Sequence, residues 1–512
     1  MPHPISWRHD APASLVVFLV AVPLCLGIAL ASGAPLFSGI IAGIVGGIVV
    51  GALSDSELMV SGPAAGLTVI VLNAITELGA FEVFLAAVVL AGVLQMVLSV
   101  LRAGVIGYYF PTAVIKGMLA AIGLLLILKQ IPHAIGYDVQ AMGDDAFMDS
   151  SGETTFAAIS SAIAQVQWGA VIVAAVTLPL LFMWGKGPLR AAKNVPAPLA
   201  VVAIGILLNA VFGAFVPTLE IADSHLVNLP VASGLGDFLS GFTLPDFSAM
   251  LRPAVWQVAL VLAVVASLES LLSLQATDEM DPMRREASTD RELLAQGAGN
   301  VVSGLIGGLP VTGVIVRSAT NIDAGARTRF SAILHGVLLL VAALLFTRFL
   351  NTIPLAALAA VLIHVGYKLA NPALFIAVWK KGKVYAIPFY STVGAILLTD
   401  LLRGILIGLA IGIIVILRDQ LESPPFTEVS PKGAVLKRLQ LHDNVNFLHK
   451  SALHQVLEKL ARGSRIEIDA RNSRRIDPDV LDVIHRFRET ARERDIDYRL
   501  VGVPEIGSLA KR

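Results

Sequence analysis

SGPAAGLT (residues 61–68) interrupts one apolar region of the sequence, and GLPVTGV (residues 308–314) interrupts another. Both segments contain Pro-x-x-Gly at one constant offset, so that Pro63 corresponds to Pro310 and Gly66 to Gly313. Proline has no N–H and glycine has no side chain, so each segment can run extended and then open a new helix. Matched interruptions in two halves indicate an internal repeat, the pattern of transporters with inverted halves.

The composition around these segments is that of a membrane protein. Of 512 residues, 56% are hydrophobic and 15% are charged, and the mean hydropathy is +0.77. Soluble proteins carry roughly 25% charged residues. Apolar runs near the length that crosses a bilayer (roughly 20 residues) occur at 14–30, 83–101 and 169–184. The net charge of zero gives no field that would attract nucleic acid, and a single cysteine excludes an intrachain disulfide.

Charges between the apolar runs predict the orientation. Alternate connections carry Lys and Arg, for example at Arg102, Lys186 and Arg285, whereas the stretch 133–168 has none and contains Asp138, Asp144, Asp145, Asp149 and Glu153. By the positive-inside rule, the basic connections and both termini face the cytoplasm. We therefore expect an even number of segments, about fourteen with some short or broken, in a plasma membrane that is the inner membrane of a bacterium.

A break in composition near residue 420 divides the chain into domains. Residues 1–418 are predicted to form the transmembrane transport domain, with repeats at about 14–210 and 255–418, and residues 419–431 a polar linker. Residues 432–512 are predicted to form a small cytoplasmic α/β domain. Its strands are expected at 434–441, 465–470 and 498–503, and its helices at 451–461 and 478–494. It contains no glycine-rich phosphate loop or nucleophile motif, which favours an interaction or regulatory module.

The two broken segments predict an anion site. Helix starts leave backbone N–H groups unpaired, and two N-termini that face each other near the middle of the bilayer would hold a small anion. The hydroxyl groups of Thr68 and Thr312 could add donors. The alternative is that the small residues only let helices pack closely. The candidate substrate-binding positions are Ala64, Ala65, Gly66, Thr68, Val311, Thr312 and Gly313.

Charged residues inside apolar segments extend this prediction. Glu269 lies in VLAVVASLESLL (261–272) without Lys or Arg nearby in sequence, and an intramembrane carboxylate marks a functional site by default. It suits reversible protonation, or it could bind a sodium ion together with Ser273, one helical turn on. Arg317, two turns past Pro310, is either a positive charge at the anion site or a snorkelling anchor at a helix end.

At these residues the sequence resembles the SulP family of inorganic anion transporters, whose animal relatives include pendrin and prestin. The resemblance covers nearly the whole chain. Its motifs are VPLCLGIA (22–29), SGPA (61–64), SLESLL (267–272), QGAGN (296–300) and GGLP (307–310) leading to Arg317-Ser318. The C-terminal part looks like the STAS domain that usually ends these proteins.

The resemblance implies fourteen segments in two inverted halves, a core domain and a gate domain. It implies an anion site between the broken third and tenth segments, homodimers, and elevator-like alternating access. Glu269 matches a position where the sodium-coupled bicarbonate branch carries aspartate, and Ser273 matches a threonine there, so coupling to H⁺ or to Na⁺ stays open. In the STAS-like part, Pro478-Asp479 replaces the serines of the family's Ile-Asp-Ser-Ser-Gly turn, which argues against a phosphorylation switch.

We therefore expect a secondary transporter of small inorganic anions, with sulfate or bicarbonate as the leading substrates and no cofactor. Three alternatives remain open at this stage: an uncoupled anion exchanger or channel, a nucleobase carrier of the same architecture, and a membrane protein that senses anions. The segments offer few side chains that could pair with a nucleobase. An enzyme is not expected, because no nucleophile–base pair or metal cluster is evident in the sequence.

Overall fold

The computed structural model describes residues 6–139, 142, 147, 154–184, 195–228, 241–422, 425–429 and 436–505. Four of the acidic residues noted above (Asp144, Asp145, Asp149 and Glu153), Lys186 and parts of the predicted linker lie outside the described residues. Contacts between residues divide the chain into two units, Met1–Leu409 and Ala410–Arg512.

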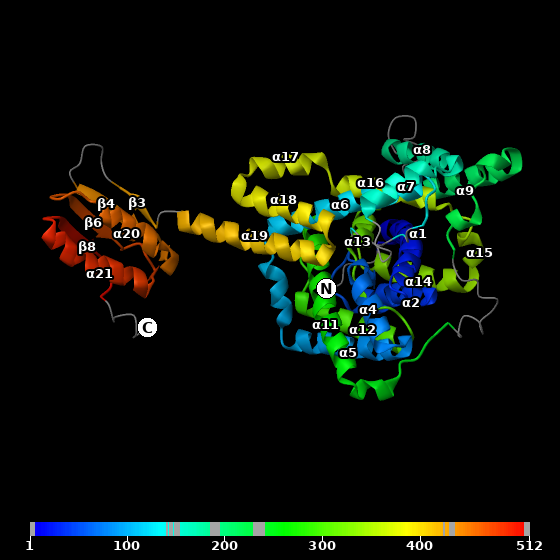
Figure 1. Cartoon of the computed structure of the whole chain (residues 1–512), viewed down its shortest axis with the longest axis horizontal. Coiled ribbons are helices and arrows are strands. Elements are labelled where there is room, and N and C mark those ends of the chain that lie inside the picture. Colours follow the sequence, from blue (N-terminus) through cyan, green and yellow to red (C-terminus); the bar gives the residue numbers. More distant parts are fainter. Residues whose placement is uncertain are drawn as a thin grey trace. The chain divides into compact units, whose positions relative to one another are not determined.

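The first half of the large unit is almost entirely helical (Figure 1). Its elements, including a π-helical turn η1 and the 3₁₀ turns η2 and η3, are α1 (Trp7–Ala31), α2 (Leu36–Val45), η1 (Gly46–Val50), α3 (Gly51–Leu53), β1 (Ser61–Pro63), η2 (Ala65–Leu67), α4 (Thr68–Leu78), α5 (Phe81–Val100), η3 (Ala103–Tyr109), α6 (Thr112–Ala134), α7 (Thr155–Ala164), α8 (Trp168–Met183) and α9 (Ala197–Phe215).

The second half follows three 3₁₀ turns, η5 (Pro217–Leu219), η6 (Asp223–His225) and η7 (Phe247–Leu251). It again contains one short strand between helices. Its elements are α11 (Pro253–Met280), α12 (Thr289–Leu305), β2 (Val311–Gly313), α13 (Ile315–Asp323), α14 (Phe330–Leu345), α15 (Thr347–Leu350), α16 (Leu355–Leu369), α17 (Pro372–Lys380), α18 (Lys383–Leu398) and α19 (Leu401–Glu422).

Many of these helices can cross a membrane. Within the described residues, eight are long and apolar enough, and α7 with α8 forms a ninth candidate that is bent by 115° at a short break. Three shorter apolar helices lie at Ala65–Leu78, Phe330–Leu345 and Lys383–Leu398, and the first of them directly follows a broken segment. The chain is a multi-pass membrane protein, and the predicted fold class is confirmed.

The helices of the large unit pack in two groups. One group contains α1, α2, α5, α11, α12 and α14, and the other contains α6, α8, α9, α16 and α18. In Figure 1, α5, α11 and α12 lie together in the lower part of the view, and α6, α16 and α18 lie in the upper part. The first group carries both broken segments and corresponds to the predicted core domain. The second corresponds to the predicted gate domain.

The two broken segments meet in a two-stranded antiparallel sheet. Strand β1 pairs with β2 in the register Ser61 with Gly313, Gly62 with Thr312 and Pro63 with Val311. Pro63 fits in so short a ladder because a strand end does not need its N–H. The pairing brings together two segments that lie about half the chain apart, as the repeat predicts.

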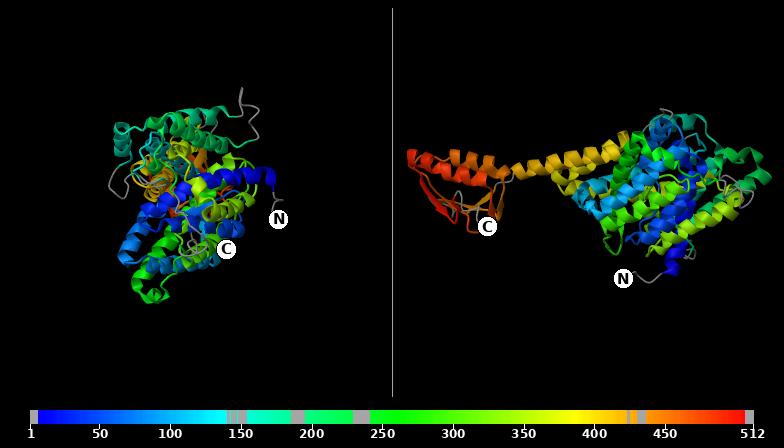
Figure 2. Two further views of the ribbon diagram at one scale, coloured as in Figure 1. Left: turned by 90° about the vertical axis from the view of Figure 1, so that its right-hand side faces the viewer. Right: turned by 90° about the horizontal axis from the view of Figure 1, so that it is seen from below.

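The small unit contains a four-stranded sheet with the order β3-β4-β6-β8. Strands β4, β6 and β8 are parallel and β3 is antiparallel to β4. Two helices lie on one face of this sheet (Figure 2). The elements are β3 (Phe426–Glu428), β4 (Leu436–Leu441), β5 (Asn444–Val445), η8 (Phe447–His449), α20 (Lys450–Glu458), β6 (Arg465–Asp469), β7 (Arg475–Ile476), α21 (Pro478–Glu493) and β8 (Asp497–Val501).

The three strands and two helices expected from the sequence are all present in the small unit, within a few residues of the expected bounds. Strand β3 lies within the stretch for which a linker was expected, and β5 pairs with β7 in a small separate ladder. The predicted turn before α21 is an N-cap, because the Asp477 side chain accepts a hydrogen bond from the N–H of Asp479.

Candidate functional site

Two helix N-termini follow the paired strands. Helix α4 begins at Thr68 after the 3₁₀ turn η2, and α13 begins at Ile315 directly after Val314. Neither helix start has a side-chain cap. The first N–H groups of a helix have no partner within the helix, so these starts supply donors and positive partial charge.

A buried polar network holds β2 against the neighbouring helices. The Asn300 side chain of α12 accepts a hydrogen bond from Val311 N at 2.6 Å and donates to Val311 O at 3.0 Å. Its amide also donates to Gln95 Oε1 of α5, and Gln95 Nε2 donates to Ser267 Oγ of α11. Buried polar groups of this kind specify one arrangement, because an unpaired member is costly. The strand is therefore fixed from three helices.

A narrow cavity of about 10 Å³, barely the room that one water molecule needs, lies beside the broken segments. Its polar side chains are Glu269 and Ser273 of α11, and Gly66 and Ile315 come from the two broken segments. The remaining lining is apolar and comes mostly from elements across the cavity: Met118, Val265, Leu272, Leu401, Leu402 and Ile405. The cavity therefore has one polar wall and one apolar wall.

Glycines allow the broken segments to approach α11. A Cβ built on Gly66 would lie 3.1 Å from Glu269 Oε1, and one on Gly313 would lie 2.7 Å from Met59 Sδ and 3.2 Å from Ser273 Cβ. In addition, Gly313 N donates to Ser270 Oγ at 3.2 Å. Both broken segments therefore contact the helix that carries the predicted coupling residues, and larger side chains at these glycines would push them apart.

The two predicted threonine donors differ in the structure. The Thr68 hydroxyl donates to Ala65 O at 2.7 Å, one turn earlier, so its hydrogen is already used. The Thr312 hydroxyl is wholly buried and has no hydrogen-bond partner in the described part of the chain. Ala64 and Val311 are also buried, and Ala65 is half-buried.

Arg317 lies on the other side of the strands. Its guanidinium is wholly buried, with Nη2 at 3.2 Å from Cys25 Sγ, and it touches the backbone of Gly62. It is not among the described residues that line the cavity. The positive charge therefore faces the site through the β1 backbone.

Sequence reasoning missed the residues that support the strands. Gln296 and Asn300 belong to the QGAGN motif quoted above, but that motif alone did not indicate their roles. Ser267 belongs to the SLESLL motif, which likewise gave it no role, and Gln95 had no signal beyond being polar in an apolar run. A single polar residue on an apolar helix can face any neighbouring helix, so only the packing identifies its partner.

Comparison with known proteins places the chain among membrane anion transporters. Residues 7–392 match the model of the sulfate permease family. This chain belongs to the sulfate permease family. YvdB of Bacillus subtilis (strain 168) is 27% identical over 418 residues, which cover 82% of this chain and 75% of YvdB. The bicarbonate transporter BicA of Picosynechococcus sp. is 24% identical over 412 residues, 78% of this chain and 68% of BicA.

Among solved structures, SLC26A9 has the same fold, with a TM-score of 0.66 at 14% identity. The match covers 97% of this chain and 84% of that one. The predicted SulP resemblance, the membrane character and the fold are thereby confirmed. The predicted site residues stay a prediction for this member of the sulfate permease family.

Proposed function

We propose that this chain is a secondary active transporter that carries sulfate or bicarbonate, and that the anion binds at the cavity between the broken segments and α11. The observation that carries the proposal is the contact of Gly66 with the Glu269 carboxylate. It puts a titratable group of α11 next to a predicted anion-binding segment, so one cavity serves both ligands.

The donors for the anion are the backbone N–H groups that open α4 and α13, at Ala65, Gly66 and Ile315. Thr312, which pairs with Gly62, is not among the described residues that line the cavity. Arg317 adds positive potential from behind β1. Such groups suit a small oxyanion, because each N–H donates to one oxygen and the helix starts favour negative charge. Gly62, Gly66 and Gly313 keep the backbone free to approach.

Glu269 is the proposed coupling residue, with H⁺ favoured over Na⁺. Close to a bound anion, the neutral carboxyl is favoured over the ionised one by Coulomb repulsion, so anion and proton binding promote each other. Ser273, in the same cavity, would complete a sodium site with Glu269 if Na⁺ is the coupling ion. The apolar wall from α6 and α19 is suited to sliding past the polar wall, which supports elevator-type movement of the core group against the gate group.

The chain acts as a homodimer in a bacterial plasma membrane, with both termini cytoplasmic, as the Lys and Arg of alternate connections favour. The C-terminal unit is a STAS-like regulatory or assembly module outside the permeation path.

The test is uptake of labelled sulfate and labelled bicarbonate by the purified protein in liposomes, with an imposed proton or sodium gradient. The proposal expects uptake of one anion that accelerates as external pH falls and does not respond to sodium. Uptake that needs sodium would select the sodium alternative. Equal uptake without either gradient would select the uncoupled exchanger or channel, and no uptake of either anion would contradict the proposal.

A further inference from the structure

Glu292 of α12 is a buried carboxylate that the proposed transport mechanism does not use. Its side chain is wholly buried, and its hydrogen-bond partners in the described part of the chain are the Ser54 hydroxyl and the Gln296 amide, both neutral. Burying a carboxylate without a cationic partner is costly. A group kept at that cost, next to the candidate site, needs a reason.

The contacts of Glu292 lead directly to the first broken segment. Glu292 and Gln296 lie one helical turn apart on the same face of α12. Gln296 Nε2 donates to Glu292 Oε1 at 2.7 Å and to Ser61 Oγ at 2.8 Å. Ser61 is the first residue of β1 and pairs with Gly313 of β2. The orientation of the Gln296 amide is thus set by the Glu292 carboxylate on one side and by Ser61 of β1 on the other.

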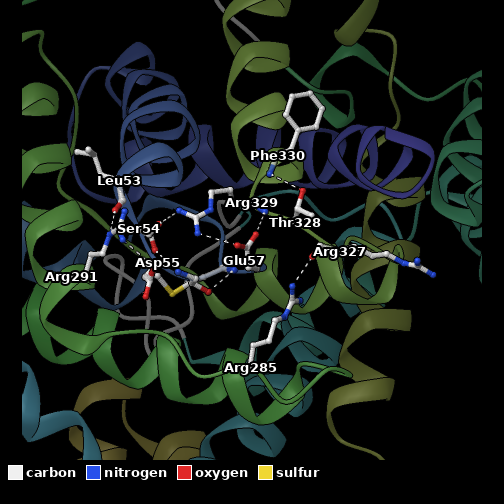
Figure 3. Close-up of polar contacts among 12 residues, drawn as sticks. Leu53, Ser54, Asp55, Glu57, Arg285, Arg291, Arg327, Thr328, Arg329 and Phe330 are labelled. Carbon is white, nitrogen blue, oxygen red and sulfur yellow. Dashed lines mark hydrogen bonds and ion pairs between the residues drawn. The ribbon is translucent and has the colours of Figure 1, made fainter. Parts of the chain in front are cut away.

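The second oxygen of Glu292 holds the connection that enters β1. Glu292 accepts a hydrogen bond from the Ser54 hydroxyl. The Ser54 carbonyl accepts from Arg329 Nη1 at 2.5 Å, and Arg329 also pairs with Glu57 (Figure 3). Figure 3 shows the same connection bound by Arg291 through Leu53 and Asp55. Both ends of residues 54–61 are therefore fixed from the second half of the chain.

We propose that Glu292 is a positioning residue of the anion site, acting through Gln296 and Ser61 on strand β1. The inference rests on the proposed function. A carboxylate offers one acceptor oxygen to Ser54 and the other to Gln296, whereas a glutamine offers only one acceptor oxygen. Replacing Glu292 with Gln removes one acceptor oxygen and the negative charge. Either Gln296 loses its partner on that side or the Ser54 hydroxyl must turn round to accept, and in both cases the amide of Gln296 and strand β1 are held less firmly.

The expected effect is on affinity rather than on the transport rate. Glu292, Gln296, Ser54 and Ser61 all belong to the core group or its connections, and none lies on the apolar wall formed by α6 and α19. The network therefore shapes the donors for the anion without touching the surface across the cavity.

The experiment measures initial rates of labelled sulfate or bicarbonate uptake in liposomes over a range of concentrations. Glu292→Gln should raise KM about tenfold, which corresponds to about 1.4 kcal/mol of binding free energy, and leave the maximum rate within about twofold. Glu286→Gln, at an exposed position six residues earlier, is the matched control and should behave as wild type.

The decisive variant exchanges the pair. In Glu292→Gln/Gln296→Glu, the new amide accepts from Ser54 and donates to the new carboxylate, which in turn accepts from the Ser61 hydroxyl. Every hydrogen bond is satisfied again, so KM should return to within about threefold of wild type. A Glu292→Gln protein with wild-type KM, or an exchanged protein that has wild-type thermal stability but retains the raised KM, would overturn the inference.

Ser61→Ala tests the same link when Glu292→Gln does not fold. It removes the acceptor on β1 and should raise KM by a similar factor. If Ser61→Ala had a wild-type KM, the inference would be wrong.

If the wild type takes up neither anion, the proposed function fails. The same variants are then compared by the sulfate concentration that protects them from thermal unfolding, with the same expected order.

Discussion

Gly62 of β1 lies against the guanidinium of Arg317, so closely that a Cβ at position 62 would be 2.1 Å from Nη1. Arg317 is wholly buried, with Cys25 on its other side, so the guanidinium cannot move away into solvent. In the proposed site, the backbone of Gly62 is what lies between this positive charge and the bound anion. The low dielectric constant of the buried surroundings would strengthen the attraction between the two.

Gly62→Ala should therefore displace either the strand or the guanidinium. We expect a folded protein with lower thermal stability and at least a tenfold loss of anion affinity, about 1.4 kcal/mol. Gly394→Ala in α18 is the matched control, because a Cβ there would meet nothing within 4 Å. Affinity is measured by anion-dependent protection from thermal unfolding. Unchanged affinity in Gly62→Ala would show that Arg317 does not act through this strand.

Gly313→Leu tests the approach of the second broken segment to α11. Its Cβ alone would clash with Met59 Sδ at 2.7 Å and crowd Ser273 at 3.2 Å, so β2 must move away from the cavity. We expect substrate protection to disappear while size-exclusion chromatography still shows the wild-type assembly. Gly66→Leu should do the same at the Glu269 carboxylate. Near-normal affinity in a folded Gly313→Leu protein would rule out a site between the two segments.

The broken segments could be predicted because proline and glycine restrict the backbone wherever they stand. Pro63 and Pro310 cannot continue a helix, and their equal spacing to Gly66 and Gly313 made the repeat visible before any packing was known. The same holds for the strands and helices of the small unit, whose alternating hydrophobic pattern is local.

The support of the site could not be predicted, because it depends on which helix faces which. Gln296 binds Ser61 of β1, which is distant in sequence. Asn300 binds Val311 of β2, which follows α12 after a turn. Nor does a position in α13 tell on which side of the strands Arg317 lies. The hydrogen bond from the Thr68 hydroxyl to Ala65 O, by contrast, is local. Threonine side chains near a helix start often bond to the backbone in this way.

Removal of the small unit should leave the anion site intact. Strand β3 at Phe426–Glu428 belongs to the C-terminal sheet, so a clean truncation ends at Glu422 rather than within that sheet. We expect anion protection in detergent to stay within about threefold of the full-length protein, whatever happens to the transport rate. A folded truncation without anion binding would place part of the site in the small unit.

A pH-dependent contact joins α6 to η6. Asp138, just after α6, accepts hydrogen bonds from His133 Nδ1 at 2.5 Å and from His225 Nδ1 at 2.6 Å. Burial raises the pKa of Asp138, but the two histidine hydrogen bonds outweigh it and hold this pKa below its ordinary value of 3.8. The stabilisation is therefore present above pH 3.8 and is lost as the pH falls through the lower, folded-state value.

Asp138→Asn should accordingly lower Tm at pH 7, and the difference from wild type should shrink below pH 3.8. Asp223→Asn, an exposed position in η6, is the control and should leave Tm unchanged at both pH values. The measurement is thermal unfolding in detergent as a function of pH. A Tm difference that grows on acidification would contradict the assignment of Asp138 as an ionised acceptor.

The central claim is that Glu269 couples anion movement to a proton, and one measurement tests it most directly: concentrative anion uptake by Glu269→Gln in liposomes with an imposed pH gradient. Glutamine imitates the protonated carboxyl next to Gly66, so the variant should still bind and exchange the anion. It should no longer accumulate the anion above the external concentration when the outside is acidic. Accumulation by Glu269→Gln with wild-type dependence on pH and on sodium would contradict the account.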